Sequence, residues 1–315
     1  MALTDKLTAI GAAIREKTGS TDLLRLDEMP GAIAAIETGG GGNDDILAAM
    51  IDGSITEIKI PDKVTEIPEN AFSSRKKLES VDLNNVSKIN GQSFQYCNAL
   101  KEIDLSKVQY FYGSNIFMSS SVTEIDLSSA KNIGVSSTSY DRTFNGMAKL
   151  EVVKNFKPTK LGNYTFMGCS VLKTIDLTEI LEIGTQVFNQ CNNLGDIILP
   201  KIQKIGESAF AFSSNGATQN RTLIDIGPDC VEIKAKAFQY SKYVTTLIVR
   251  ATTPPTLANV NAFDFLPTTS GDYGVYIYVP RDSLQAYWNA TNWSSFVGSG
   301  KTYRAIEDYP EITGG

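Results

Sequence analysis

The sequence predicts an α/β solenoid, a right-handed β-α superhelix of stacked coils with parallel strands, a short helical leader and capped ends. Three repeated columns of apolar residues predict this architecture. The first column has eight members, separated by 22, 22, 22, 28, 22, 22 and 28 residues. Its members are Ile67, Ile89, Phe111, Ile133, Leu161, Ile183, Ile205 and Ile233.

The second column is mainly phenylalanine and follows the first by five residues. Its members are Phe72, Phe94, Phe144, Phe166, Phe188, Phe210 and Phe238, with Ile116 and Phe117 filling the remaining coil. Since one 22-residue unit cannot bury its own apolar face, neighbouring units must stack around a shared interior.

The third column opens each unit with two apolar residues separated by one polar residue. The first of the two is Val81, Ile103, Ile125, Val153, Ile175, Ile197 or Ile224. The second is Leu83, Leu105, Leu127, Asn155, Leu177, Leu199 or Ile226. This alternation is typical of a strand with one buried face, so we expect a strand at the start of each coil.

With these three columns, the repeats resemble those of a known family. The units LKEIDLSKVQYFYGSNIF from Leu100 and LKTIDLTEILEIGTQVFNQC from Leu172 are similar to BspA-like bacterial leucine-rich repeats. The resemblance covers about residues 55–263. It implies a leucine-rich-repeat solenoid and a surface or adhesion-type interaction protein. The resemblance is more specific for fold than for activity, because the family is defined by its scaffold.

Composition excludes several function classes. The chain has no His, which removes the usual general base and the commonest zinc ligand. Its net charge of −6 argues against nucleic-acid binding. We find no phosphate-binding glycine motif, and we expect no cofactor. No apolar run approaches the ~20 residues of a membrane helix, so membrane insertion is not expected.

Charges in the first 19 residues interrupt the apolar stretch that a signal peptide needs. The sequence therefore predicts synthesis in the cytoplasm, with association with a virion, or with the cell surface by another route, as alternatives.

Three of the four cysteines occupy one repeat position. Cys97, Cys169 and Cys191 each follow a column phenylalanine by three residues. We expect them to be buried free thiols. A Cys169–Cys191 disulfide stays open, because adjacent coils would place the two Cα atoms about 5 Å apart.

We divide the chain into a helical leader (residues 1–38), a glycine linker (39–43), a solenoid with its N-terminal cap (44–263) and a C-terminal cap (264–315). The leader's apolar stripe predicts an oligomer or assembly contact, with packing back on the solenoid as the alternative. Residues 282–285 resemble a capping box, and Tyr287, Trp288 and Trp293 supply apolar area to the C-terminal cap. A sugar-binding aromatic platform is the alternative for these rings.

Two candidate binding regions follow from the repeats. Residues 134–143 and 213–220 are polar insertions that would project as loops from one edge. The outward strand positions form an acidic face, and a solvated polar surface is the plain alternative for it. Calcium needs six to eight converging oxygens, so we expect no metal. The residues of this candidate face are Asp82, Glu102, Asp104, Glu124, Asp126 and Asp176.

These patterns predict a non-enzymatic interaction scaffold that recognises a protein or glycan surface. An enzyme would have to rely on carboxylates alone. The alternative function is a structural or receptor-binding component of a prophage tail, because the leader resembles the helical leaders of phage and prophage tail-associated proteins.

Overall fold

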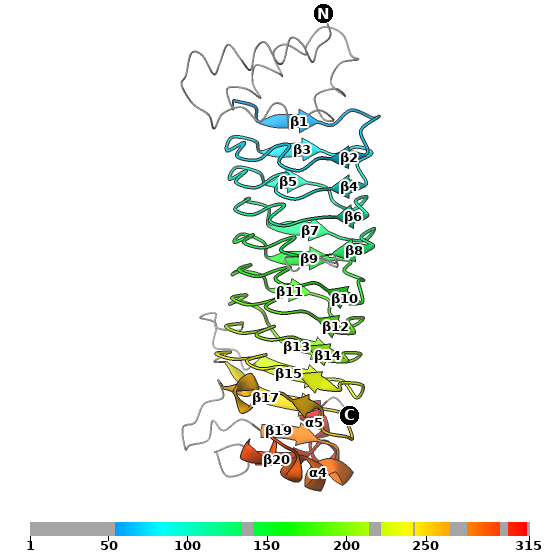
Figure 1. Ribbon diagram of the computed structural model, residues 1–315, viewed down its shortest axis with the longest axis vertical. Coiled ribbons are helices and arrows are strands. Elements are labelled where there is room, and N and C mark those ends of the chain that lie inside the picture. Colours follow the sequence, from blue (N-terminus) through cyan, green and yellow to red (C-terminus); the bar gives the residue numbers. More distant parts are fainter. Residues whose placement is uncertain are drawn as a thin grey trace, which may run out of the picture.

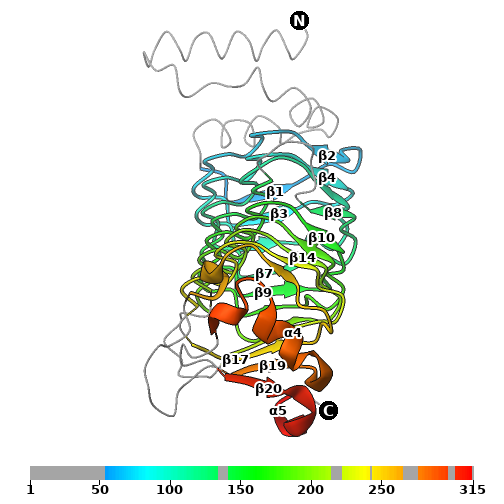
Figure 2. The same ribbon diagram turned by 60° about the horizontal axis from the view of Figure 1, so that its bottom comes forward.

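The computed structural model describes residues 54–133, 141–213, 222–241, 243–264, 276–296 and 302–313. The coils stack along one axis, with β1 (Glu57–Lys59) near one end and β20 (Thr302–Ala305) near the other (Figure 1). In the oblique view with the C-terminal end brought forward, the coils follow one another with a similar outline (Figure 2). The predicted leader, the glycine linker, the part of the N-terminal cap before residue 54 and most of both predicted insertion loops lie outside the described residues.

The predicted strand of each coil is confirmed. These strands pair in parallel in three sheets, ordered β1-β3-β5, β11-β9-β7 and β13-β15-β17-β19-β20. They form what we call the first ladder. Their bounds are β1 Glu57–Lys59, β3 Ser80–Asp82, β5 Glu102–Ile103, β7 Glu124–Asp126, β9 Val152–Lys154, β11 Thr174–Ile175, β13 Ile197–Leu199, β15 Thr222–Ile226, β17 Val244–Val249, β19 Tyr276–Val279 and β20 Thr302–Ala305.

A second ladder, which the alternation pattern does not predict, runs through the first apolar column. It consists of two parallel sheets, β2-β4-β6-β8 and β10-β12-β14-β16-β18. Each strand has only two residues, a polar one and a buried one, which is too short to show a period of two. The bounds are β2 Glu66–Ile67, β4 Lys88–Ile89, β6 Tyr110–Phe111, β8 Asn132–Ile133, β10 Lys160–Leu161, β12 Glu182–Ile183, β14 Lys204–Ile205, β16 Glu232–Ile233 and β18 Thr256–Leu257.

The expected β-α superhelix is wrong for the described repeats, where turns connect the strands. Within the described residues, α-helix occurs only as α4 (Leu284–Asn289) and α5 (Pro310–Thr313). The 3-10 segments are η3 (Val260–Phe263), η4 (Arg281–Ser283), η5 (Ser294–Phe296) and η6 (Ile306–Asp308).

The backbone around each column phenylalanine explains this correction. Residues two positions before and two after the ring are left-handed in most coils, as at Gln186 (φ 54°) and Gln190 (φ 64°) around Phe188. A left-handed residue ends a right-handed helical turn. Two of them four residues apart therefore fold the segment into successive turns.

The phenylalanine column forms one continuous stack. Ring centroids of successive members lie between 5.1 Å (Phe188–Phe210) and 6.1 Å (Phe117–Phe144) apart. The stack extends one coil beyond the predicted column to Phe263, which lies 5.4 Å from Phe238. The column members are essentially inaccessible to solvent and belong to one hydrophobic core.

The free-thiol prediction is confirmed, and all four cysteines are buried. The Cys169 thiol donates to the Phe144 carbonyl (3.3 Å), and that of Cys191 donates to the Phe166 carbonyl (3.3 Å). Each thiol therefore bonds to the preceding coil. Burial raises the pKa of Cys169 to about 12, so its thiol stays protonated at neutral pH.

The C-terminal aromatic residues close the core. Tyr287 and Trp293 are fully buried and donate to the carbonyls of Ala251 and Pro255, both at 2.8 Å. A sugar platform built from the three predicted rings is therefore excluded. The predicted capping box is also wrong, because Asp282 lies inside η4 and the residue that precedes α4 is Ser283, whose side chain makes no capping bond.

Candidate binding surface

The predicted acidic residues all lie on the outward side of the first ladder. Asp82 ends β3, Glu102 begins β5, and Glu124 and Asp126 lie at the two ends of β7. Asp104 and Asp176 each follow the last residue of a strand, β5 and β11 respectively. The structure therefore brings Glu102 and Asp104 together on one coil and Glu124 and Asp126 together on the next.

The four aspartates share a structural task. In each, one carboxylate oxygen accepts the backbone N–H of the residue two positions on. The partners are Asn84 for Asp82 (3.0 Å), Ser106 for Asp104 (2.9 Å), Ser128 for Asp126 (2.8 Å) and Thr178 for Asp176 (2.9 Å). Such bonds fold the chain into a turn directly after the strand. Turn formation therefore explains why aspartate recurs at this position.

Hydrogen bonds also influence two of these carboxyl groups. Bonds from the Thr178 hydroxyl and backbone hold the pKa of Asp176 below its usual value. At Asp126, partial burial raises the pKa. Hydrogen bonds from Ser128 and Asn155 and the positive charge of Lys154 lower it by more, so the pKa lies below its usual value. Both groups therefore carry a full negative charge at neutral pH.

Cations of neighbouring coils compensate part of the acidic face. Lys154 on β9 pairs with Glu124 (2.5 Å), and the Asn155 amide donates to Asp126 (2.7 Å). Glu102 has no ion pair or side-chain hydrogen bond among the described residues. Asp104 bonds only to the Ser106 backbone within that same part of the chain. Glu102 and Asp104, like Asp176, are thus exposed and form no ion pair with a described residue, and they are the two such members of the face that share one coil.

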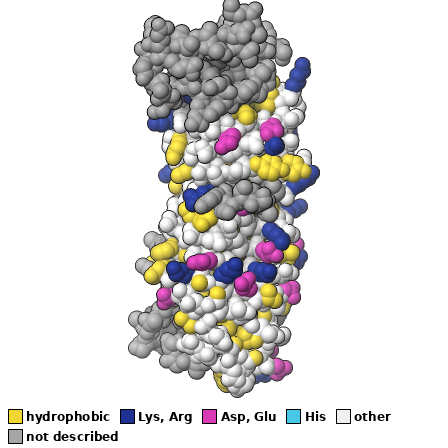
Figure 3. Space-filling view, in the orientation of Figure 1, with side chains coloured by type: hydrophobic (Ala, Val, Ile, Leu, Met, Phe, Trp, Pro, Cys, Tyr) yellow, Lys and Arg dark blue, Asp and Glu magenta, His cyan; other side chains and the backbone are white. Residues whose placement is uncertain are grey.

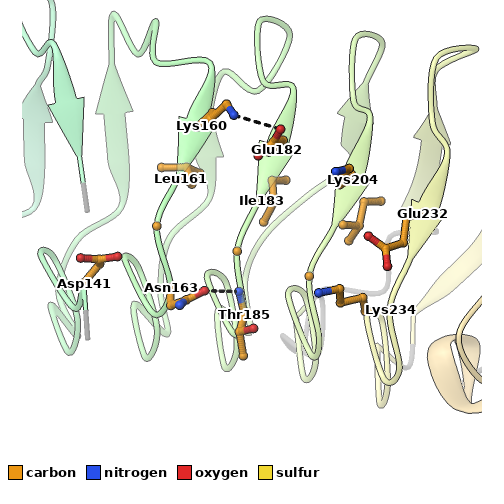
Figure 4. A pocket seen from close by; sticks show the side chains of 14 residues that line it. Asp141, Lys160, Leu161, Asn163, Glu182, Ile183, Thr185, Lys204, Glu232 and Lys234 are labelled. Atoms are coloured by element: carbon orange, nitrogen blue, oxygen red, sulfur yellow. Dashed lines mark hydrogen bonds and ion pairs between the residues drawn. The ribbon is translucent and has the colours of Figure 1, made fainter. Parts of the chain in front are cut away.

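A shallow groove of about 270 Å³ crosses the second ladder from β10 to β16 (Figure 4). Lys160 and Glu182 form an ion pair (3.0 Å) on one wall, and Asn163 accepts the Thr185 backbone N–H (2.8 Å) on the other. Lys204, Glu232 and Lys234 lie around its far end. Sequence reasoning did not identify this groove, although each of its strands begins with a charged residue.

Glycines form the floor of this groove for reasons of packing. A Cβ on Gly184 would lie 2.6 Å from the Asn163 side chain, and one on Gly206 would lie 2.4 Å from the Gly184 carbonyl. Close approach of successive coils therefore requires glycine here. Hence the groove follows from coil packing, and its glycines do not indicate a ligand.

The visible surface carries charges of both signs, interspersed with hydrophobic side chains (Figure 3). Among the described residues, no group of three or more His, Cys, Asp or Glu could hold a metal ion. No helix in that part of the chain is long and apolar enough to cross a membrane.

The model of the BspA type leucine-rich repeat region matches residues 51–145 and 140–245, in six copies. The chain belongs to the BspA-type leucine-rich repeat family. This family is one of repeat scaffolds, whose fold typically mediates protein interactions.

Solved structures of other leucine-rich repeat proteins are similar to this BspA-type chain. A leucine-rich repeat protein from Bacteroides ovatus is 23% identical, with a TM-score of 0.57 over 71% of this chain. This chain spans 55% of the length of that protein. At this identity the similarity shows the fold alone.

A leucine-rich cell surface protein from Faecalibacterium prausnitzii is 17% identical, with a TM-score of 0.34 over 80% of this chain and 79% of that one. A leucine-rich repeat protein from Eubacterium ventriosum is 14% identical, with a TM-score of 0.34 over 87% and 76%. No curated protein matches this BspA-type chain.

Proposed function

We propose that this BspA-type protein is a non-enzymatic binding scaffold that holds a basic segment of a partner protein at Glu102 and Asp104. The observation that carries this proposal is their exposed, uncompensated charge beside a coil whose acidic residues are compensated. Such charges attract a cationic partner and cost little desolvation at the rim of an interface.

The supporting geometry is the ladder itself. Parallel strands of successive coils hold outward side chains in fixed columns about 4.8 Å apart. A ligand therefore binds a preformed array, and little conformational entropy is lost on binding. A solenoid can extend such an array over several coils.

The expected effect of reversing the charge of this pair is weaker binding of an octalysine peptide. Combined Glu102→Lys and Asp104→Lys should lower affinity about ten-fold at low salt, because each exposed charge contact contributes up to about 1 kcal/mol and turns repulsive. Fluorescence anisotropy with labelled peptide at about 10 mM and about 150 mM salt measures this, and the effect should shrink at the higher salt.

A matched control is combined Glu69→Lys and Glu207→Lys, which makes the same total charge change on exposed turns outside the first ladder. It should leave affinity nearly unchanged. If both variants lose affinity equally, the peptide senses net charge alone and the acidic pair is not a site.

A second candidate function is a component of a prophage tail that docks through residues 1–38, on the strength of the leader's sequence. Deletion of residues 1–38 should then abolish self-association or assembly while leaving the solenoid folded, as analytical ultracentrifugation and circular dichroism would report. If the shortened chain keeps the oligomeric state of the full chain, the docking role is excluded.

A further inference from the structure

The repeats provide an internal comparison at the position two residues after each column phenylalanine. This position is left-handed in all eight coils where the structure describes it, with φ between 58° and 75° in every case. Its occupants are Ser74, Tyr96, Ser119, Gly146, Gly168, Gln190, Phe212 and Tyr240.

The fold does not require a side chain here. Gly168 donates its backbone N–H to the Asn189 carbonyl (2.8 Å), and Phe212 makes the equivalent bond to the Gln239 carbonyl (2.8 Å). The backbone therefore has the same support with glycine as with phenylalanine. Because a left-handed conformation is unfavourable for a bulky residue, aromatic side chains at this position need another reason.

Two of these aromatic residues lie on adjacent coils and face solvent together. Phe212 and Tyr240 stack with ring centroids 4.7 Å apart and planes inclined by 27°. They remain 39% and 42% exposed, whereas the rings of the buried column, two residues away, are inaccessible. Tyr243, three residues further on, is 38% exposed. Phe212 and Tyr240 thus combine an unfavourable backbone conformation with exposed aromatic surface.

Two amide residues are neighbours of this pair in the repeat. Gln190 holds the equivalent position on the preceding coil and is exposed, and Gln239 precedes Tyr240. The Gln239 amide is oriented by a bond to Asp264 (3.3 Å). Amides both donate and accept hydrogen bonds, which matches hydroxyl groups. The apolar strip is only two rings long, much less than the roughly 800 Å² per partner of a stable protein interface.

We propose that Phe212 and Tyr240 form a binding site for a neutral oligosaccharide. The C–H edges of sugar rings would lie against the aromatic strip, and Gln190 and Gln239 would bond to hydroxyl groups. This site is separate from Glu102 and Asp104, so it stands whether or not a basic partner binds there.

The test is titration of the intact chain with four neutral hexasaccharides, composed of β-1,4-glucose, α-1,4-glucose, β-1,4-mannose and β-1,4-N-acetylglucosamine. Calorimetry and saturation-transfer NMR measure binding. At least one should bind, and combined Phe212→Gly and Tyr240→Gly should weaken it about ten-fold or more. The double variant should fold, since glycine already occupies this position at Gly146 and Gly168.

The matched control is Tyr96→Gly, because Tyr96 is 41% exposed and left-handed at the same repeat position, where its neighbours on the adjacent coils are Ser74 and Ser119. It should bind like the wild type, as should Glu102→Lys. The proposal is overturned if none of the four saccharides binds, if the double variant binds unchanged, or if Tyr96→Gly causes an equal loss.

Discussion

Phe188→Ala is expected to lower the free energy of unfolding by about 3–5 kcal/mol. The Phe188 ring is inaccessible and stacks between Phe166 (5.6 Å) and Phe210 (5.1 Å). Its removal leaves a cavity in the middle of the column, where the rings of both neighbouring coils lose contacts. Because each coil is stabilised mainly by its neighbours, the loss weakens two interfaces at once.

Urea denaturation followed by circular dichroism measures this loss. The control is Phe212→Ala, the same substitution at an exposed ring 24 residues further on. It should change stability by less than about 1 kcal/mol. Equal losses for the two variants would show that the buried stack is not the main source of stability.

Gly206→Ala is expected to lower the free energy of unfolding by about 3 kcal/mol, which is near the upper end of the usual cost of adding a methyl group to a packed site. The added Cβ would lie 2.4 Å from both the carbonyl carbon and the oxygen of Gly184, and 2.8 Å from the Ile183 oxygen. These are backbone atoms of the preceding coil. Since Gly206 also donates its N–H to the Ile183 carbonyl (2.8 Å), relief of the clash would break the ladder.

The comparison for this prediction is Gly195→Ala, whose Cβ would have its nearest neighbour, the Lys173 oxygen, 3.9 Å away. That variant should be neutral or slightly stabilised, because alanine restricts the unfolded chain. Thermal unfolding of both variants measures the difference. Equal melting temperatures for Gly206→Ala and the wild type would mean that the coils are further apart than the structure places them.

Much of the fold can be predicted from the sequence because spacing alone identifies buried columns. The spacing also places Cys169 and Cys191 correctly. It fails where a coil departs from the repeat: Asn155 stands in a column position, but its amide bonds to Asp126 and the adjacent Phe156 is buried beside Phe166 (6.1 Å). Such a one-residue slip depends on tertiary packing, which spacing does not contain.

The turns could not be predicted for a different reason. Residues such as Gln186, Gln190 and Ser208 favour no left-handed conformation on their own, and bonds to the next coil hold them there. The expected helix was therefore wrong, and the missed second ladder followed from strands of two residues.

The candidate site was predictable only in part. The outward positions of Asp82, Asp104, Asp126 and Asp176 follow from strand alternation. Their turn-forming bonds and the compensation of Glu124 by Lys154 depend on the structure. Aromatic residues at the position of Phe212 and Tyr240 were visible in the sequence, but their exposure depends on the left-handed backbone.

The central claim, that successive units stack as parallel strands in register, is tested most directly by pairs of engineered cysteines. Glu182 on β12 is in register with Lys204 on β14, which in turn is in register with Glu232 on β16. The native thiols are buried and should not react. Glu182→Cys with Lys204→Cys should form a disulfide on mild oxidation of the native protein, because adjacent strands lie about 4.8 Å apart. Glu182→Cys with Glu232→Cys, two coils apart, should stay reduced; cross-linking of that pair instead of the first would contradict the stack.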